Sequence, residues 1–330
     1  MIYYKKILLS VVGLVAVFFG LLWVGNSTSA LSMSPMKQAI SLMPGDTYTG
    51  RVKIYQQGEG GELHYKASIV PLSVDDSDNQ YYGIFDKETS YTDIVNWTAL
   101  TNGQETVGYG DAIDGYAPFG KEVELTYTIR VPQDARGGGH YFAVKVETVP
   151  SDNDSGNVTI KDSISIASVV YAEVAGDINI SGSIKDNNVP GFLLNPPITT
   201  SFVASNEGNT HAEITYYMQV FPLFSGEEIY TTEEDSSTDY VLPGTTRFIE
   251  QSWNEAPSVG IFKVRQTVYY DSLDSEPSVT EKMVIICPVW LLFLVFFVIA
   301  ALIIWIVMRV RGRGKKKSDR REAPASSATE

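Results

Sequence analysis

Cysteine and histidine are both scarce in this chain. Its 330 residues include one cysteine, Cys287, and three histidines. With a single cysteine no intramolecular disulfide can form, and the stretch before Cys287 has neither thiolate metal ligands nor a Cys–His nucleophile. Two common ways of stabilising or activating a small domain are therefore excluded.

Helical periodicity is nearly absent between residues 31 and 282, and period-two alternation recurs instead. In residues 123–131, five apolar side chains alternate with polar ones, which indicates a strand with one buried and one wet face. The same pattern predicts strands at 48–54, 63–69, 142–146, 164–174, 198–204, 212–220 and 262–270. Many short strands separated by turns, with no intervening helix, predict an all-β fold of two tandem antiparallel immunoglobulin-like β-sandwiches.

The N-terminus resembles an export signal. Lys5 and Lys6 precede an uncharged apolar run at 7–24, and small residues follow up to Ala30. This order predicts a signal peptide at residues 1–30. The run is longer than usual for such a peptide, so an uncleaved signal anchor is the alternative.

The other end carries a second apolar run, at residues 289–308. Twenty helical residues cover about 30 Å, the thickness of a bilayer's hydrocarbon core, and we predict a transmembrane helix at 284–308. A basic cluster beside a span marks its cytoplasmic side, so residues 309–330 form the predicted cytoplasmic tail and 31–282 lie outside the cell. The residues that predict this topology are Arg309, Arg311, Arg313, Lys315, Lys316 and Lys317.

Charge is distributed unevenly along the chain. The whole carries −14, but residues 31–282 hold 36 acidic and 15 basic side chains, a net charge of −21. The tail carries +5. An ectodomain this acidic repels nucleic acid and anionic lipid head groups. Because small animal ectodomains are commonly held together by disulfides, their absence here favours a prokaryotic surface.

The ectodomain is long enough for two domains. A boundary near Gly176 leaves a second sandwich at 176–282, close to the size of one immunoglobulin-like domain. The first domain, at 31–175, is larger because it contains a polar insert at residues 73–120.

Turn and strand motifs follow one another in a characteristic order through residues 43–141. They are Met43-Pro44-Gly45-Asp46, the segment 90–97 that ends in Trp97, Ile129-Arg130-Val131-Pro132, Asp134, and Gly137-Gly138-Gly139-His140-Tyr141. This order resembles the bacterial cell-surface proteins that interact with WxL-domain proteins. The resemblance implies a signal peptide, two sandwich domains of which the first is like a pilus chaperone, a membrane helix and a short basic tail.

The insert is rich in aromatic residues, which supply large contact areas at protein interfaces. We predict partner binding by Tyr81, Tyr82, Phe85, Tyr109 and Tyr116. The alternative is that such rings fold back onto their own sandwich, which is the expectation for Trp97.

Acidic loops offer weak metal candidates in Asp75, Asp76 and Asp78. Their spacing does not match an EF-hand, and Asp and Ser favour turns, so we interpret them as solvated turn residues. No G-x-S-x-G elbow is present to position a serine nucleophile. The sequence predicts no cofactor and no enzymatic activity.

These features predict a membrane-anchored, single-pass bacterial surface protein that binds or scaffolds. The expected partner is another envelope protein or cell-wall polysaccharide. One alternative is a structural subunit that pairs through strand edges, and another is a cell-wall-active enzyme.

Overall fold

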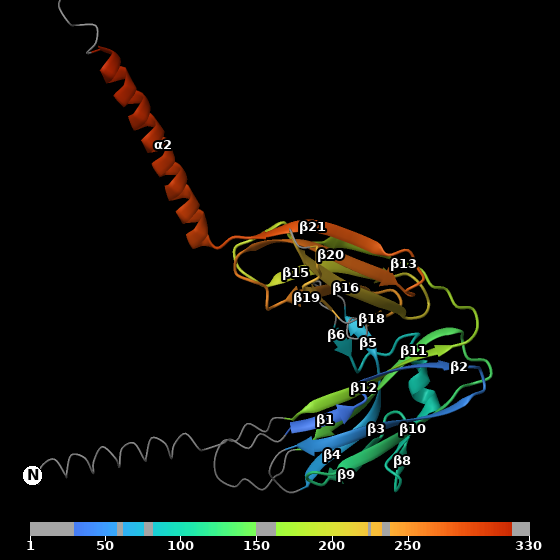
Figure 1. Ribbon diagram of the computed structural model, residues 1–330. Helices are drawn as coiled ribbons and strands as arrows, with labels where there is room; N and C mark the ends of the chain where they lie inside the picture. The colour runs from blue at the N-terminus through green and yellow to red at the C-terminus, as the bar shows by residue number, and fades with distance from the viewer. Residues whose placement is uncertain are drawn as a thin grey trace, which may run out of the picture. The chain divides into compact units, whose positions relative to one another are not determined.

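The computed structural model describes residues 30–57, 62–75, 82–149, 163–223, 226–232 and 238–318 (Figure 1). The chain divides into two compact units. Unit 1 takes residues up to Ile180 with Glu207–His211 and Leu242–Thr245, and unit 2 takes the rest. The predicted signal peptide lies outside the described residues except for Ala30, and so does the end of the predicted tail from residue 319.

Unit 1 contains two five-stranded sheets. The β3 sheet has the order β1-β3-β10-β7-β8 and the β11 sheet has the order β2-β12-β11-β4-β9. The strands of the β3 sheet are β1 (Ala30–Ser34), β3 (Thr47–Gln57), β7 (Thr98–Thr101), β8 (Thr106–Val107) and β10 (Glu122–Arg130). Those of the β11 sheet are β2 (Lys37–Leu42), β4 (Leu63–Pro71), β9 (Ala112–Ala117), β11 (Gly138–Thr148) and β12 (Ser165–Val174).

The two sheets face each other across one hydrophobic core. Alternate residues of β10, such as Leu125 and Tyr127, are fully buried, as the alternation in the sequence predicts. They belong to the same cluster as Ala67 of β4 and Val144 of β11. Unit 1 is therefore a β-sandwich with its inward faces apolar.

The insert contains a small ribbon and a short helical turn. The ribbon pairs β5 (Ser73–Asp75) with β6 (Tyr82–Ile84), and the 3-10 helix η2 (Asp93–Trp97) follows. Ile94 and Val95 of η2 are buried in the core of the sandwich. The later part of the insert adds β7 and β8 to one sheet and β9 to the other.

Unit 2 also contains two sheets. The three-stranded β15 sheet has the order β13-β15-β19, and the β20 sheet has the order β14-β21-β20-β16-β17 with β18 paired to β16. The strands of the β15 sheet are β13 (Gly182–Asn188), β15 (Ile198–Asn206) and β19 (Thr246–Trp253). Those of the β20 sheet are β14 (Phe192–Leu193), β16 (Ala212–Pro222), β17 (Tyr230–Thr231), β18 (Thr238–Val241), β20 (Gly260–Tyr270) and β21 (Ser278–Ile286).

Inward residues of both sheets form the core of unit 2. Ile198 of β15 and Trp253 of β19 share a cluster with Val264 of β20 and Ile286 of β21. The all-β prediction is confirmed for the described residues. Nearly all pairs are antiparallel; β2 with β12 and β14 with β21 pair in parallel.

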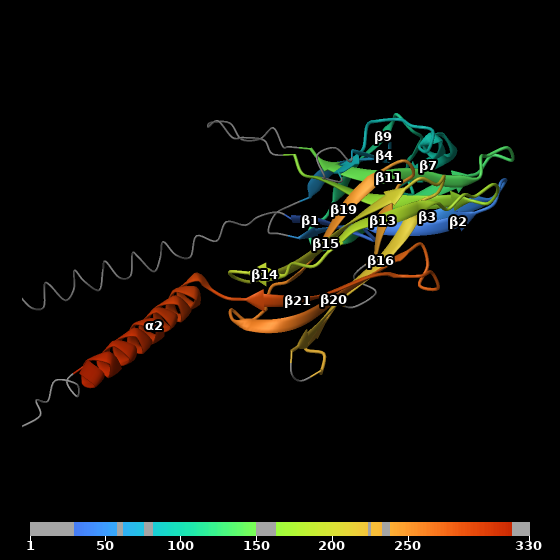
Figure 2. The ribbon, with the colours of Figure 1, turned by 90° about the horizontal axis from the view of Figure 1, so that it is seen from above.

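The last described element is the helix α2 (Val289–Ser318). Val289–Arg309 is long and apolar enough to cross a membrane, and none of its most apolar window is buried inside the protein. Only Cys287 and Pro288 separate β21 from α2, so the strand leads almost directly into the helix (Figure 2). A single apolar C-terminal helix is as the sequence predicts.

Candidate partner-binding surface

The strand β9 is the edge strand of the β11 sheet, and its alternation decides which of its residues face solvent. Ile113 and Ala117 are fully buried. Gly115 lies opposite Tyr65 of β4, and the Tyr65 ring fills the space that a Gly115 side chain would take. Tyr116, next in the chain, therefore faces outward.

Tyr116 is more than half exposed, at 57% of its maximal surface. It lies directly opposite His64 of β4. The two rings stack with their centroids 4.7 Å apart and their planes 13° apart. The same imidazole contacts the Asp114 carboxylate through Nε2. One side chain therefore holds both the aromatic ring and the carboxylate in place.

Lys66 and Asp114 are opposite one another in the β4–β9 register, and both are exposed. We call Tyr116, His64, Asp114 and Lys66 the Tyr116 surface. It places an exposed aromatic ring beside a carboxylate, an ammonium group and an imidazole. Such a combination can pack against the apolar face of a sugar or a side chain while bonding its polar edge.

The other aromatic residues proposed for binding are placed differently. Phe85 is half-buried and packs with Leu72 and Tyr141. Tyr109 is half-buried against the main core, and its hydroxyl donates to Glu88 Oε1 at 2.7 Å. Tyr81 lies outside the described residues, and Tyr82 lies in β6. Of Phe85, Tyr109 and Tyr116, Tyr116 is the one whose ring is exposed.

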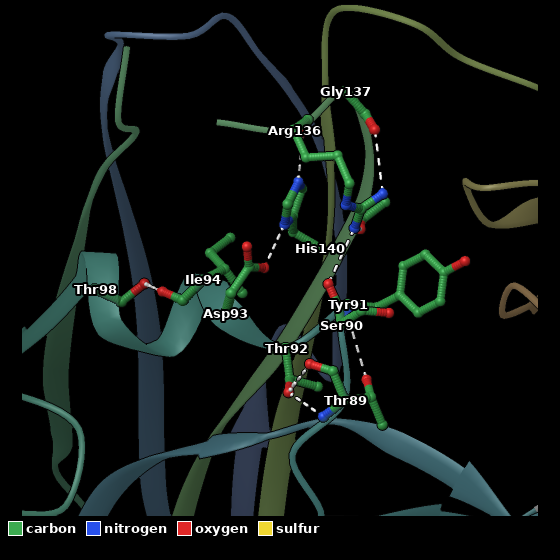
Figure 3. A network of polar contacts seen from close by, with 11 residues as sticks. Thr89, Ser90, Tyr91, Thr92, Asp93, Ile94, Thr98, Arg136, Gly137 and His140 are labelled. Atoms are coloured by element: carbon green, nitrogen blue, oxygen red, sulfur yellow. Dashed lines mark hydrogen bonds and ion pairs between the residues drawn. The ribbon is translucent and has the colours of Figure 1, made fainter. Parts of the chain in front are cut away.

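Buried polar contacts around His140 hold the middle of the insert to β11 (Figure 3). The fully buried imidazole has Nδ1 2.6 Å from Asp93 Oδ1 and Nε2 2.8 Å from the Arg136 carbonyl oxygen. Trp97 packs on the same ring at 4.8 Å and is half-buried against the core. Trp97 thus covers its own sandwich, as the sequence predicts, and η2 is fixed by these contacts.

Arg136 connects the backbone just before η2, at Ser90, to the start of β11. Its guanidinium donates to the carbonyl oxygens of Ser90 at 3.1 Å and Gly139 at 3.2 Å, and it lies 4.9 Å from the centre of the Tyr91 ring. Figure 3 shows this side chain reaching between the two backbone segments. Its donors face main-chain carbonyls, so we assign Arg136 a structural role.

Two of the three acidic metal candidates lie outside the described residues. Asp75 ends β5 and is exposed, while Asp76 and Asp78 lie outside the described residues. Among the residues that the structure describes, no three His, Cys, Asp or Glu side chains cluster as metal ligands.

The residues that predict the topology belong to α2. Arg309 lies 4.9 Å from the Trp305 ring centre. The remaining five occupy the last turns of the helix: Arg311, Arg313, Lys315, Lys316 and Lys317.

Sequence reasoning did not identify His64, Lys66 or Asp114 as neighbours of Tyr116. His64 stands at an outward position of its own strand, which the alternation of residues 63–69 indicates. The residue that its imidazole contacts, Asp114, is however 50 residues away in the chain. Pairing at that separation depends on register between strands, which alternation within one strand does not encode.

No family model matches the chain, and no curated protein matches it either. Several solved structures of pilus chaperones are similar to it. The class 5 fimbriae chaperone CfaA is 14% identical over 77% of this chain and 99% of its own, with a TM-score of 0.33. The E. coli chaperone DraB is 10% identical over 77% and 97%, also at 0.33. A structure of the Salmonella enterica SafA pilin with the SafB chaperone is 11% identical over 78% and 98%, at 0.34. These values are too low to carry a functional argument.

Proposed function

We propose that this chain is a membrane-anchored bacterial cell-surface protein that binds or scaffolds and has no catalytic role. The observation that carries the proposal is the direct succession of a β-sandwich and an apolar helix, joined by two residues. In this arrangement the sandwich units are held at the membrane, with the basic end of α2 in the cytoplasm. The resemblance of residues 43–141 to the WxL-interacting family supports the same placement.

The Tyr116 surface is the proposed contact with the partner. Exposed aromatic rings at interfaces contribute large amphipathic area at low entropy cost. The ring of Tyr116 is already oriented by His64, so binding does not have to order it. The ectodomain's charge of −21 disfavours anionic polymers. The proposed ligand is therefore a neutral cell-wall polysaccharide or a basic patch on another envelope protein.

Binding of the detergent-solubilised full chain to purified cell walls tests this proposal. We expect Tyr116→Ala to weaken binding about tenfold and Tyr116→Phe to weaken it less than twofold, since the stacked ring remains. A matched control is Phe248→Ala on β19, which removes an aromatic ring of unit 2 that is 38% exposed. Equal binding by Tyr116→Ala and the control would remove the Tyr116 surface from the proposal.

A second candidate function follows from the position of β9. This strand ends the β11 sheet, so its outer edge is available for an added strand from another protein. The chain would then be a structural subunit of an envelope complex. Ala112→Pro or Asp114→Pro at this edge would abolish complex formation if pairing is used, whereas Tyr116→Phe would leave it intact.

The enzyme alternative is tested in the same preparations. Release of soluble wall fragments, lost on Asp114→Asn, would revive it. Intact walls after prolonged incubation favour the binding role.

A further inference from the structure

An exposed apolar row crosses three strands of the β20 sheet, β14, β21 and β20, and continues to the residue that follows β16, at the end nearest α2. It consists of Phe192, Ile285, Ile261 and Leu223, which are 50%, 38%, 40% and 41% exposed. Phe192 and Ile261 lie on either side of Ile285 in the β14-β21-β20 register. Leu223 adjoins Ile261, since its N–H donates to the Ile261 carbonyl at 3.2 Å. Figure 2 shows β14, β21 and β20 in this region.

The outward direction of the row is set by the alternation of each strand. The neighbours Leu193, Phe262 and Ile286 point inward and pack in the core of unit 2. Moving any of these strands by one residue would expose the core and bury the row. Phe192, Ile285 and Ile261 are therefore held on the surface by the fold of the sandwich itself.

The side chains change character along the strands, away from α2. The next outward residues are Met283, Lys263 and Phe221, followed by Arg265 and Glu281. Both cations bond the single Glu281 carboxylate, Lys263 at 2.7 Å and Arg265 at 2.8 Å. An apolar zone followed by a charged and polar zone is the order found in segments that rest at a membrane interface.

The chain enters α2 close to this row. Ile285 precedes Val289 by four residues, which can span at most about 14 Å. The head-group region of each leaflet is about 5–7 Å thick, so this short connection keeps Ile285 near that region when α2 begins at the hydrocarbon core. Trp290, in the first turn of α2, is 63% exposed and suits the membrane interface, where tryptophan is enriched. Because the tether is so short, contact between row and lipid is intramolecular in effect and needs little affinity of its own.

We infer that the apolar row rests in the head-group region of the membrane that α2 enters, so that unit 2 lies against the bilayer. The inference rests on the proposed function, because it requires α2 to span. The net negative charge of the ectodomain opposes contact with anionic lipid, so the contact is apolar and does not need anionic head groups.

The test uses the full chain in phosphatidylcholine vesicles, with Cys287→Ser as the background. Single spin labels are attached at Phe192→Cys, Ile261→Cys, Glu250→Cys and Ile299→Cys. Glu250 is exposed on β19 in the opposite sheet and serves as the matched control. Ile299 lies midway along the apolar stretch Val289–Arg309 of α2. Power saturation then measures how accessible each label is to oxygen and to a water-soluble nickel complex.

We expect the oxygen-to-nickel ratio at positions 192 and 261 to exceed that at 250 by at least threefold. A ratio equal to that at 250, with 299 inside the bilayer, would overturn the inference and leave the anchoring intact. Nickel access at 299 would overturn both. Broadening between labels at position 261 that disappears on dilution with unlabelled chain would assign the row to a second copy, which also contradicts the inference.

Discussion

The phenol ring of Tyr127 lies across Gly50, its direct partner in the register of β3 and β10. A Cβ on Gly50 would overlap the ring atoms, and both residues are buried. The phenol continues past the glycine and donates to Gln38 Oε1 of β2 at 3.0 Å. Because Gly50 has no side chain, Tyr127 of the β3 sheet can extend across it and hydrogen-bond to the β11 sheet.

Gly50→Ala should therefore lower the free energy of unfolding by about 1–3 kcal/mol, because the added methyl displaces the ring. Gly108→Ala is the control, since a Cβ there meets open space and the backbone has no positive φ. Chemical denaturation of the detergent-solubilised chain measures both. Similar midpoints for the two variants would show that the Tyr127 contact does not constrain Gly50.

Burial raises the pKa of the Tyr127 hydroxyl above its usual value, and the nearby Tyr48 adds to the rise. A raised pKa in the folded state means that the neutral phenol contributes stability below pH 10, and that this contribution is lost as the pH rises further. Between pH 10 and pH 11 the free energy of unfolding should fall in both proteins. The fall should be smaller in the Tyr127→Phe variant than in the unmodified chain, by up to about 1.4 kcal/mol. Unfolding at these two pH values measures the difference, and equal losses would contradict it.

The contact between His140 and Asp93 predicts a local stability effect. Removing the carboxylate with Asp93→Ala leaves the buried Nδ1 without this partner, which should cost about 1–3 kcal/mol. Asp93→Asn keeps an oxygen in place and should cost less. Asp111→Ala, at an exposed turn, is the control and should change the midpoint little. Proteolysis near η2 should follow the same order of variants.

The stacking of His64 on Tyr116 predicts a ring-dependent binding effect. His64→Ala removes the stacked partner and should weaken cell-wall binding about three- to tenfold, since such pairs contribute about 0.5–1.5 kcal/mol. His64→Phe retains an aromatic ring at this position and should preserve most of the affinity. If both variants bind equally well, Tyr116 is not oriented by this contact.

The sequence predicted the strands well where alternation is strong. Residues 123–131 alternate cleanly, and β10 buries Leu125, Tyr127 and Ile129 as expected. Period-two alternation reports directly which side chains face the core, so this part of the fold needs no long-range information. The parallel pairing of β2 with β12 could not be predicted in this way, because the two strands are far apart in the chain.

The candidate site was harder to predict than the fold. Aromatic content alone does not distinguish Tyr116, which is exposed, from Tyr109 and Phe85, which pack against the protein. Tyr116 is exposed because it occupies an outward position in the alternation of β9. Tyr109 and Phe85 are half-buried because the insert packs them against the rest of unit 1. Gly115 was the available signal, since a glycine in a strand often marks a close approach by another side chain.

The most direct test of the account asks on which side of the membrane each part of the chain lies. With Cys287→Ser as background, single cysteines at Thr246→Cys in β19 and Ser318→Cys at the end of α2 are exposed to a membrane-impermeant maleimide on intact cells. We predict labelling at position 246 without permeabilisation and labelling at 318 only after it. Protection of position 246 in intact cells, or labelling of 318 from outside, would contradict the proposal that the sandwich units are displayed on the cell surface.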